Sequence, residues 1–470
     1  MNEAALFQRL TELLTRYRQT RGEGPVVDYL DPQTLAQRLE LERPAAGDWE
    51  QILRWLELYL AHSVRTDHPR FLNRMWAGAN LPSILGEMVV AVNNASACTW
   101  EGAPVATLME RYMLRTMLEL VGFEDGEGQM TTGSSAGNLV AMLAARNTHL
   151  ENAHQDGLWQ EQPLTAFVSA EAHYSLDKAA NVLGLGTRHL VKVPVDTSGA
   201  MDPQALEAAL ERCVREGKRP FFVAATLGTT VRGAFDPLPP LIELRERYGF
   251  WLHGDGAWGG AVLLDDELRK RFAPGVEALD SLTWDFHKMA GSNLMCNMLL
   301  VNRRPGLFRC VCSAGEHDYL FREEEPTHAL DMGVGSLQCG RRVDSLKWFL
   351  DWKYHGREGL ARRVRHYLAL AEHAERRIQT MPRLELAAPR ISFNVCFRYQ
   401  PPAGEDADQF NLALRHRLHH SGQAMVGVAR LDGRVVLRLL ITHPDQQPED
   451  VDAFLTLVQT EGDRMTEKHA

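Results

Sequence analysis

The chain is poor in cysteine, in positive charge and in long apolar runs, and each shortage excludes a class of protein. Its seven cysteines are scattered through 470 residues, which fits reduced thiols better than a disulfide framework. No run of about 20 apolar residues is present, so we expect no membrane-spanning helix. The net charge of -10 argues against a nucleic-acid partner, which would favour a basic surface. Cys310 and Cys312 lie close together, but no second pair stands at zinc-ligand spacing, so we expect no metal site.

The remaining composition is that of an ordinary globular protein, with 45% hydrophobic and 24% charged residues. The first residues carry an acid early and place Leu6, Leu10, Leu13 and Tyr17 on one face of a helix, which does not resemble a secretion signal. We therefore expect a cytoplasmic protein. Its length suggests two or three domains.

The middle of the chain alternates short apolar runs with amphipathic stretches. Helices are predicted over 201–216, where Asp202 and Pro203 form a cap and first turn, and over 238–248. Strands are predicted over 166–169, 190–195, 221–225, 250–253, 282–284 and 298–301. This alternation predicts an α/β fold with a mostly parallel sheet covered by helices.

The pattern differs at the two ends of the chain. Residues 1–75 are predicted to be helical. After Arg341, helices are predicted over 343–354, 358–379 and 449–461, with strands over 392–397 and 435–440. We therefore predict an N-terminal helical segment (1–75), a large domain (76–348) and a smaller C-terminal α+β domain (349–470).

Lys288 and Asp255 are the residues that first indicate a chemistry. Lys288 lies in the run Thr283-Trp284-Asp285-Phe286-His287-Lys288, and Asp255 follows a predicted buried strand. A lysine amine forms a Schiff base with the aldehyde of pyridoxal 5'-phosphate, and a carboxylate can hold the pyridine nitrogen protonated, which makes the ring an electron sink. The plainer alternative is an ordinary lysine at a helix start and an ordinary turn aspartate.

Other polar residues are expected near the same edge of the sheet, because ligands of parallel sheets bind at the carboxyl ends of the strands. Thr226 follows one predicted strand, and His173 follows another, where its ring could lie on a cofactor. Ser134 and Ser135 precede a helix rich in alanine and leucine, whose N-terminus could bind a phosphate. The alternatives are a serine that only caps the helix and a hydrogen-bonded structural histidine.

Motifs in a fixed order support the cofactor interpretation from about His68 to Pro444. They read His68-Pro69-Arg70-Phe71, Glu101-Gly102-Ala103-Pro104-Val105, His173-Tyr174-Ser175, Gly233-Ala234-Phe235-Asp236-Pro237, Trp251-Leu252-His253, Ala257-Trp258-Gly259-Gly260, His287-Lys288 and Gln338-Cys339-Gly340-Arg341-Arg342. In these motifs the chain resembles the group II pyridoxal-phosphate amino-acid decarboxylases, with cysteine sulfinate and glutamate decarboxylases as the most similar members.

The resemblance implies the fold of type I pyridoxal-phosphate enzymes and a homodimer with active sites at the subunit interface. Lys288 matches the Schiff-base lysine, Asp255 the partner of the pyridine nitrogen, and His173 the residue that stacks on the ring. It also implies that Ala257 packs on the opposite ring face and that Thr226 lies near the ring. The phosphate contacts would be Ser134, Ser135 and His287, and the α-carboxylate of the substrate would bind Arg438.

The sequence departs from the family pattern at two places that affect the expected geometry of the cofactor site. The usual asparagine-proline before the histidine-lysine pair is Asp285-Phe286, and a carboxylate near a phosphate is unfavourable unless it pairs with a cation. Glycines at positions 254 and 256 flank the key acid and are expected to loosen the backbone there.

The substrate and the proton donor are less directly indicated. In many relatives a loop tyrosine is the expected donor. The corresponding loop here, 313–334, has Leu330 instead, and His328 is a candidate donor by its chemistry. It could equally be a solvated loop residue.

Arg74, Trp76 and Ser96 align with positions near the distal acid group of the substrate, in a pattern similar to cysteine sulfinate decarboxylases. We therefore predict decarboxylation of a short acidic L-amino acid, cysteine sulfinate or aspartate, before glutamate. The alternatives are a decarboxylase of a non-acidic amino acid, and a catalytically poor homologue that binds the cofactor.

Overall fold

The computed structural model of the chain describes residues 2–42, 47–150, 152–158, 162–312, 319–322 and 324–467. Its contacts divide the chain into two compact units: Ala79–Leu368, and Met1–Gly78 together with Ala369–Ala470. The division into three consecutive segments stays a prediction, and the contacts group the first of those segments with the last.

The large unit contains a seven-stranded sheet. Its order is β2 (Glu127–Thr131), β8 (Asn297–Val301), β7 (Ser281–Asp285), β6 (Trp251–Asp255), β5 (Arg219–Thr226), β3 (Leu164–Ser169) and β4 (Leu190–Val193). Strands β7, β6, β5, β3 and β4 are parallel, and β8 is antiparallel to both of its neighbours. Strands β3, β6, β7 and β8 are buried at every residue, which explains the apolar runs 166–168 in β3 and 298–301 in β8. The predicted α/β fold is confirmed.

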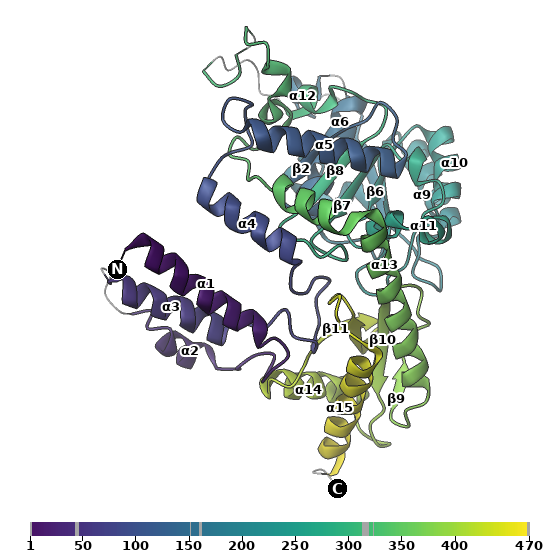
Figure 1. Cartoon of the computed structure of the whole chain (residues 1–470). Helices are drawn as coiled ribbons and strands as arrows, with labels where there is room; N and C mark the ends of the chain where they lie inside the picture. The colour runs from purple at the N-terminus through teal and green to yellow at the C-terminus, as the bar shows by residue number, and fades with distance from the viewer. Residues whose placement is uncertain are drawn as a thin grey trace. The chain divides into compact units, whose positions relative to one another are not determined.

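Helices surround this sheet (Figure 1). Helix α6 packs along β2 and β5–β8, whereas α9 and α10 pack against β4–β6. The predicted start of α9 is confirmed, because the Asp202 side chain accepts hydrogen bonds from Gln204 N and Ala205 N, with Pro203 in the first turn. The helices of the unit are α4 (Leu81–Asn93), α5 (Pro104–Val121), α6 (Ser134–His149), α7 (Ala153–Asp156), α8 (Ser175–Val182), α9 (Pro203–Arg215), α10 (Leu238–Tyr248), α11 (Asp266–Phe272) and α12 (Leu307–Cys312).

Short 3-10 helices connect some of these elements. They are η1 (Thr187–His189), η2 (Gly259–Leu264), η3 (Val276–Ala278), η4 (His328–Leu330) and η5 (Met332–Gly335). Helix α13 (Ser345–Gln379) leaves the large unit and ends in the small one. Gly356 interrupts it with non-helical backbone angles (φ 62°), which is why the sequence pattern predicted two helices here.

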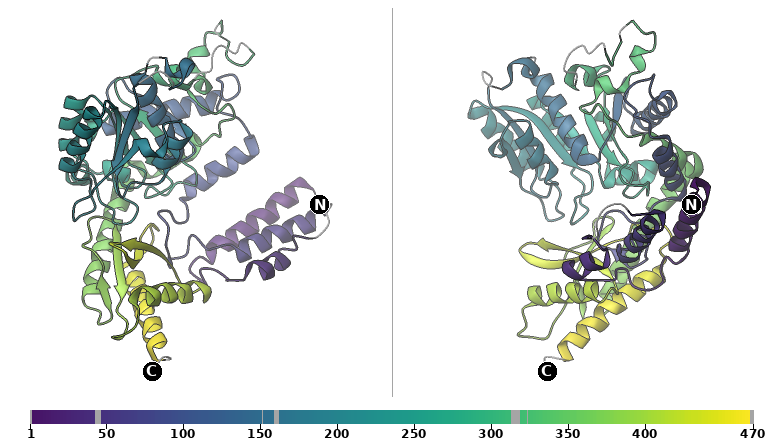
Figure 2. Two further views of the ribbon diagram at one scale, coloured as in Figure 1. Left: turned by 180° about the vertical axis from the view of Figure 1, so that it is seen from behind. Right: turned by 90° about the vertical axis from the view of Figure 1, so that its left-hand side faces the viewer.

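The small unit combines both ends of the chain. Its five-stranded sheet has the order β1 (Phe71–Leu72), β11 (Met425–Leu431), β12 (Arg434–Leu440), β10 (Asn394–Tyr399) and β9 (Leu384–Leu386). Strand β1 runs parallel to β11, and the other pairs are antiparallel. The helices are α1 (Glu3–Gln19), α2 (Pro32–Arg38), α3 (Trp49–His62), α14 (Ala407–His420) and α15 (Pro448–Glu467). Helices α1 and α3 lie side by side (Figure 2).

The described ranges were expected to contain neither a membrane-spanning helix nor a metal site. No helix there is long and apolar enough to cross a membrane. The same residues contain no group of three His, Cys, Asp or Glu side chains that could hold a metal ion.

Candidate active site

The parallel strands β5, β6 and β7 bring the predicted residues to one edge of the sheet. Thr226 at the end of β5 pairs in register with Asp255 at the end of β6. Asp255 in turn pairs with Thr283 in β7, and Lys288 follows five residues later. The electrostatic environment of His173 includes both Asp255 and Lys288, which places all of these side chains in one neighbourhood.

Lys288 forms an ion pair with a buried carboxylate. The Nζ atom of Lys288 lies 3.1 Å from Asp285 Oδ2, and His287 Nε2 lies 3.7 Å from the same oxygen. Burial alone would raise the pKa of Asp285. The charges of Lys288 and His287 and the hydrogen bonds from Lys288 and Ser134 outweigh burial and hold this pKa below its ordinary value. Asp285 therefore has the cation that a carboxylate at this position requires.

The N-terminus of α6 already contacts this carboxylate. Ser134 N donates to Asp285 Oδ1 over 3.0 Å, and Asn297 Nδ2 donates to the same oxygen over 2.8 Å and to Ser134 Oγ over 2.9 Å. The N-cap residue is Gly133, which makes no side-chain cap, so the alternative in which a serine side chain caps the helix is wrong. Ser135 is exposed in the first turn.

Asp255 and His173 are joined through Asn138. The Nδ2 atom of Asn138 lies 2.9 Å from Asp255 Oδ2 and 2.9 Å from Ser175 Oγ. Ser175 Oγ lies 2.9 Å from His173 Nδ1. Burial lowers the pKa of His173 although Asp255 opposes the shift, so the imidazole is neutral near pH 7.

Two further residues face the same edge. The Oγ1 atom of Thr226 is buried and has no hydrogen-bond partner within the described part of the chain. Since a buried hydroxyl without a partner is costly, this atom indicates a missing polar ligand. Ala257 N donates to Asp255 Oδ1 over 3.2 Å, which holds the turn after β6 against the carboxylate.

The glycines on either side of Asp255 are closely packed, and the expectation of a loosened backbone is wrong. A Cβ atom at position 254 would lie 2.7 Å from Leu279 Cδ1 and 2.9 Å from Leu282 Cδ1. At position 256 it would lie 3.0 Å from Leu282 Cδ1. The Leu282 side chain thus fills the space that Cβ atoms at these two positions would occupy.

Phe286 replaces the usual proline without disturbing the site. Its backbone N–H donates to Cys296 O over 2.9 Å, a hydrogen bond that proline could not make. Its ring is fully buried and stacks on Trp348, with 4.1 Å between ring centroids. The imidazole of His287 is buried beside it, with Nδ1 2.9 Å from Cys296 O.

The loop that carries the predicted proton donor is described in part, because residues 313–318 and 323 lie outside the described residues. His328 begins η4. Its Nε2 atom faces a guanidinium nitrogen of Arg309, and its Nδ1 atom lies 3.7 Å from Asp331 Oδ2. His328 is therefore held by charged neighbours and is not simply a solvated side chain.

The predicted substrate residues belong to both units. In the small unit Arg438 donates to Asn73 O over 3.2 Å and packs against Gly427, where a Cβ would lie 3.2 Å from Arg438 Nε. Arg74 is exposed, and Trp76 is half-buried with its ring 5.6 Å from that of Phe71. Ser96, in the large unit, accepts a hydrogen bond from Arg341 N over 3.1 Å.

Sequence reasoning missed the polar residues behind the site. Asn138 lies in the helix whose N-terminus was predicted to bind a phosphate, and His253 lies in the family motif Trp251-Leu252-His253. Asn297 lies in strand β8. A buried asparagine in an otherwise alanine-rich helix was the available signal for Asn138, because such a side chain must find partners.

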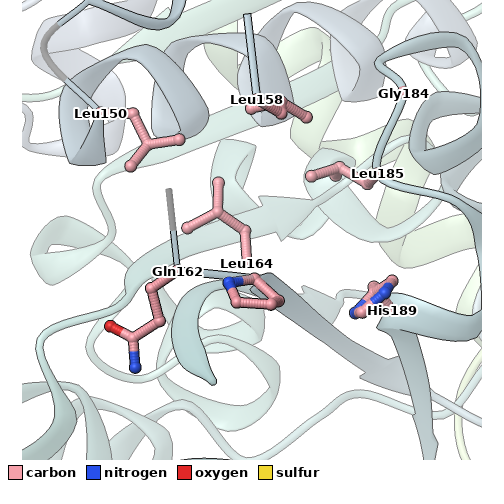
Figure 3. A pocket seen from close by; sticks show the side chains of 8 residues that line it. Leu150, Leu158, Gln162, Leu164, Gly184, Leu185 and His189 are labelled. Atoms are coloured by element: carbon pink, nitrogen blue, oxygen red, sulfur yellow. The ribbon is translucent and has the colours of Figure 1, made fainter. Parts of the chain in front are cut away.

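A pocket elsewhere in the large unit does not share this chemistry. It has a volume of about 180 Å³ and is shown in Figure 3. Its lining is Leu150, Leu158, Gln162, Pro163, Leu164, Gly184, Leu185 and His189. These residues carry no fixed pair of opposite charges, so the pocket does not suit an amino acid.

The residues at the edge of the main sheet fit pyridoxal phosphate. They supply an amine, a buried carboxylate, a neutral imidazole, a buried hydroxyl without a partner and a helix N-terminus. These are the groups that the aldehyde, pyridine nitrogen, ring face and phosphate of this cofactor need.

Comparisons with known proteins agree with this fit. Residues 32–400 match the model of the pyridoxal-dependent decarboxylase conserved domain. The chain is 35% identical to cysteine sulfinic acid decarboxylase of Mus musculus over 93% of its own length and 91% of that protein. It is 34% identical to acidic amino acid decarboxylase GADL1 of Mus musculus, over 93% of its length and 82% of that protein.

A solved structure of a similar protein has the same fold. The crystal structure of mouse CSAD superposes with a TM-score of 0.93 at 34% identity, covering 98% of each chain. Together with the domain match over most of the chain, this shows that the protein belongs to the family of pyridoxal-dependent decarboxylases.

Proposed function

We propose that this decarboxylase removes the α-carboxylate of a short acidic L-amino acid, cysteine sulfinate or aspartate, and releases CO2 and the amine. The observation that carries the proposal is the similarity over 93% of the chain to an enzyme named for cysteine sulfinic acid. A second relative, named for acidic amino acids, supports the same substrate class. Glutamate is proposed as a poorer substrate because Trp76 would shorten the pocket.

The large unit would hold the cofactor. When bound, pyridoxal phosphate supplies an aldehyde that condenses with amines and a ring that withdraws electrons. Lys288 would hold the aldehyde carbon, and Asp255 would hold the proton on the pyridine nitrogen. His173 and Ala257 would contact the two ring faces, and Thr226 would contact the ring edge. The phosphate would bind Ser134, Ser135 and His287.

The neutral state of His173 supports its proposed position. Burial lowers the pKa of this imidazole, so it would lie on a protonated ring without adding a second positive charge. The charge of Lys178, whose Nζ lies 4.6 Å from the ring centroid of Tyr174, also acts to lower this pKa.

The small unit has positive charge for a substrate with two anionic groups. Burial, and after it the charge of Arg74, lowers the pKa of both Arg438 and Arg415. The Nε atom of Arg415 is buried without a hydrogen-bond partner among the described residues. Anionic groups would relieve the repulsion between these guanidinium groups. We propose that Arg438 binds the α-carboxylate, and that Arg74, with Trp76 and Ser96, recognises the distal acid.

A substrate panel tests this proposal. CO2 release is measured with cysteine sulfinate, aspartate, glutamate and tryptophan for the wild type and for Arg74→Ala. The wild type is expected to prefer the two short acids, and Arg74→Ala to reduce that preference by about ten- to a hundredfold in kcat/KM, the scale of a hydrogen bond between charged groups. Arg430→Ala, which removes an exposed arginine of the same unit, should leave the ranking unchanged. A best substrate without a side-chain anion would overturn the proposal.

We further propose His328 as the group that returns a proton to Cα. Because Arg309 donates toward Nε2, the nitrogen that carries the proton would be Nδ1, on the side of Asp331. His328→Gln should reduce kcat for CO2 release and leave the affinity for pyridoxal phosphate unchanged. Unchanged kcat would assign the proton to another group.

A homodimer is proposed because one face of α4 is apolar and uncovered in the single chain. Its exposed residues recur at helical spacing: Leu81, Leu85, Met88, Val89 and Val92. Val92 is 72% exposed, and patches of this kind mark interfaces. A second copy of the chain is the proposed partner, with the loop around Pro326 closing over the neighbouring site. A cytoplasmic location is proposed on the free state of the cysteines.

A further inference from the structure

A chain of buried hydrogen bonds ends on the carboxylate of Asp255. Trp251 Nε1 lies 2.8 Å from Ser281 Oγ, and Ser281 Oγ lies 2.7 Å from His253 Nδ1. His253 Nε2 lies 2.9 Å from Asn138 Oδ1, and Asn138 Nδ2 lies 2.9 Å from Asp255 Oδ2. All five side chains are at most 4% exposed.

The two end residues, Trp251 and Asp255, determine in which direction each hydrogen bond of this series is donated. An indole N–H can only donate, so Ser281 Oγ accepts from Trp251 and turns its own proton toward His253 Nδ1. Burial lowers the pKa of His253 to about 4, so the imidazole is neutral and carries its one proton on Nε2. That proton is donated to Asn138 Oδ1, which leaves the Asn138 amide hydrogens directed toward the active site.

The amide of Asn138 then divides between two residues of the site. One N–H is donated to Asp255 Oδ2. The other is donated to Ser175 Oγ, whose proton is therefore free to reach His173 Nδ1 over 2.9 Å. His173 Nδ1 also accepts from Ser175 N over 3.3 Å. The imidazole of His173 consequently carries its proton on Nε2.

We propose that Asn138 is a positioning residue that orients the carboxylate of Asp255 and keeps His173 in its Nε2-protonated tautomer, with His253, Ser281 and Trp251 fixing the orientation of its amide. The inference rests on the proposed roles of Asp255 and His173 toward the cofactor. It adds that one buried amide positions both the carboxylate of Asp255 and the imidazole of His173.

Substitutions that keep or break the chain test this inference. Asn138→Leu has a similar size but no donor. His253→Gln keeps an N–H near the position of Nε2, whereas His253→Leu does not. The Kd of pyridoxal 5'-phosphate is measured by titrating the apo protein. The ¹⁵N resonance of ring-labelled cofactor is measured in the complex without substrate, because it reports the proton on the pyridine nitrogen.

Asn138→Leu should raise the Kd about tenfold, the scale of one lost hydrogen bond to a charged group, and should move the ring-nitrogen resonance toward the unprotonated value. His253→Gln should resemble the wild type, and His253→Leu should shift both measurements in the direction of Asn138→Leu. Wild-type values in Asn138→Leu would overturn the inference. If that variant does not fold, equal values for His253→Gln and His253→Leu would overturn it.

Two control variants distinguish the specific effect of Asn138 on the site from the general effect of losing a buried asparagine, and from a failure of the proposed role of Asp255. Asn302 is also buried and makes three hydrogen bonds, but it follows β8 at the opposite edge of the sheet. Asn302→Leu should lower thermal stability without changing the Kd or the resonance. Asp255→Ala should abolish the protonated signal. If it does not, the proposed role of Asp255 fails and the inference fails with it; if only Asn138→Leu is silent, the inference alone fails.

Discussion

The Asp285 carboxylate lies 3.1 Å from the Nζ atom of Lys288, so the lysine expected to capture the cofactor is held in an ion pair. The same carboxylate accepts hydrogen bonds from Ser134 N and Asn297 Nδ2. This carboxylate therefore holds the amine of the lysine that would capture the cofactor, and it occupies one donor at the start of α6.

Asp285→Asn is expected to accelerate cofactor capture near pH 7. The Lys288 amine must leave its ion pair with Asp285 before it can attack an aldehyde, and the substitution removes that ion pair. The rate is followed by the growth of visible absorption after pyridoxal 5'-phosphate is mixed with apo protein. Asp265→Asn, which alters an N-cap of α11 instead, serves as the control. A slower rate in Asp285→Asn would mean that the carboxylate assists the capture.

Gly254→Ala is expected to destabilise the fold by about 1–3 kcal/mol through overpacking. The added Cβ would lie within 3 Å of Leu279 Cδ1 and Leu282 Cδ1. The same substitution should cost less in a Leu282→Val background, since valine lacks the Cδ1 atom that the added Cβ would meet at position 282. Free energies of unfolding from denaturant titration give the coupling between the two sites. Gly340→Ala adds a Cβ where nothing lies within 4 Å and should be nearly neutral.

The stability of the protein is expected to fall in mild acid because of His253. Burial lowers the pKa of this imidazole from 6.5 to about 4. Between these values the unfolded chain binds a proton that the folded protein excludes, so stability is full above pH 6.5 and decreases as the pH falls toward 4. The loss from this residue is roughly 3 kcal/mol. His253→Gln cannot titrate, so its Tm should depend less steeply on pH over this window; an equally steep dependence would assign the loss to other groups.

The exposed face of α4 predicts the oligomeric state. Wild-type protein should sediment as a dimer of the 52.9 kDa chain. Val89→Asp should shift it to the monomer, because a charge would be buried without a partner at the interface. Val214→Asp places the same charge on an exposed valine of α9 and should leave the dimer intact. A wild-type monomer with full activity would contradict the proposed interface.

Much of the large unit could be predicted from the sequence, because several of its strands are buried on both faces and contain short apolar runs. The predicted strand 282–284 is β7 (Ser281–Asp285), and the predicted helix 238–248 has the bounds of α10. Lys288 and Asp255 could be singled out because parallel strands end at one edge of the sheet. Family motifs in order then indicated the cofactor.

The remaining features depend on pairing between distant segments, which a linear pattern does not contain. Strand β1 has two residues and joins β11, more than 350 positions later, so the small unit could not be assembled from local signals. The effect of Gly254 was predicted from its own flexibility, whereas it depends on Leu282, in the neighbouring strand. The role inferred for Asn138 likewise requires His253 and Ser175 to be near it in space.

The most direct test of the account is chemical reduction of the enzyme with its cofactor. Borohydride makes the bond between the cofactor and its lysine permanent, and peptide mass spectrometry then locates it. We predict that the added mass lies on Lys288, that the reduced enzyme releases no CO2 from cysteine sulfinate, and that Lys288→Ala is folded but inactive, whereas Lys192→Ala is active. Added mass on another lysine, or multiple turnovers by Lys288→Ala, would contradict the account.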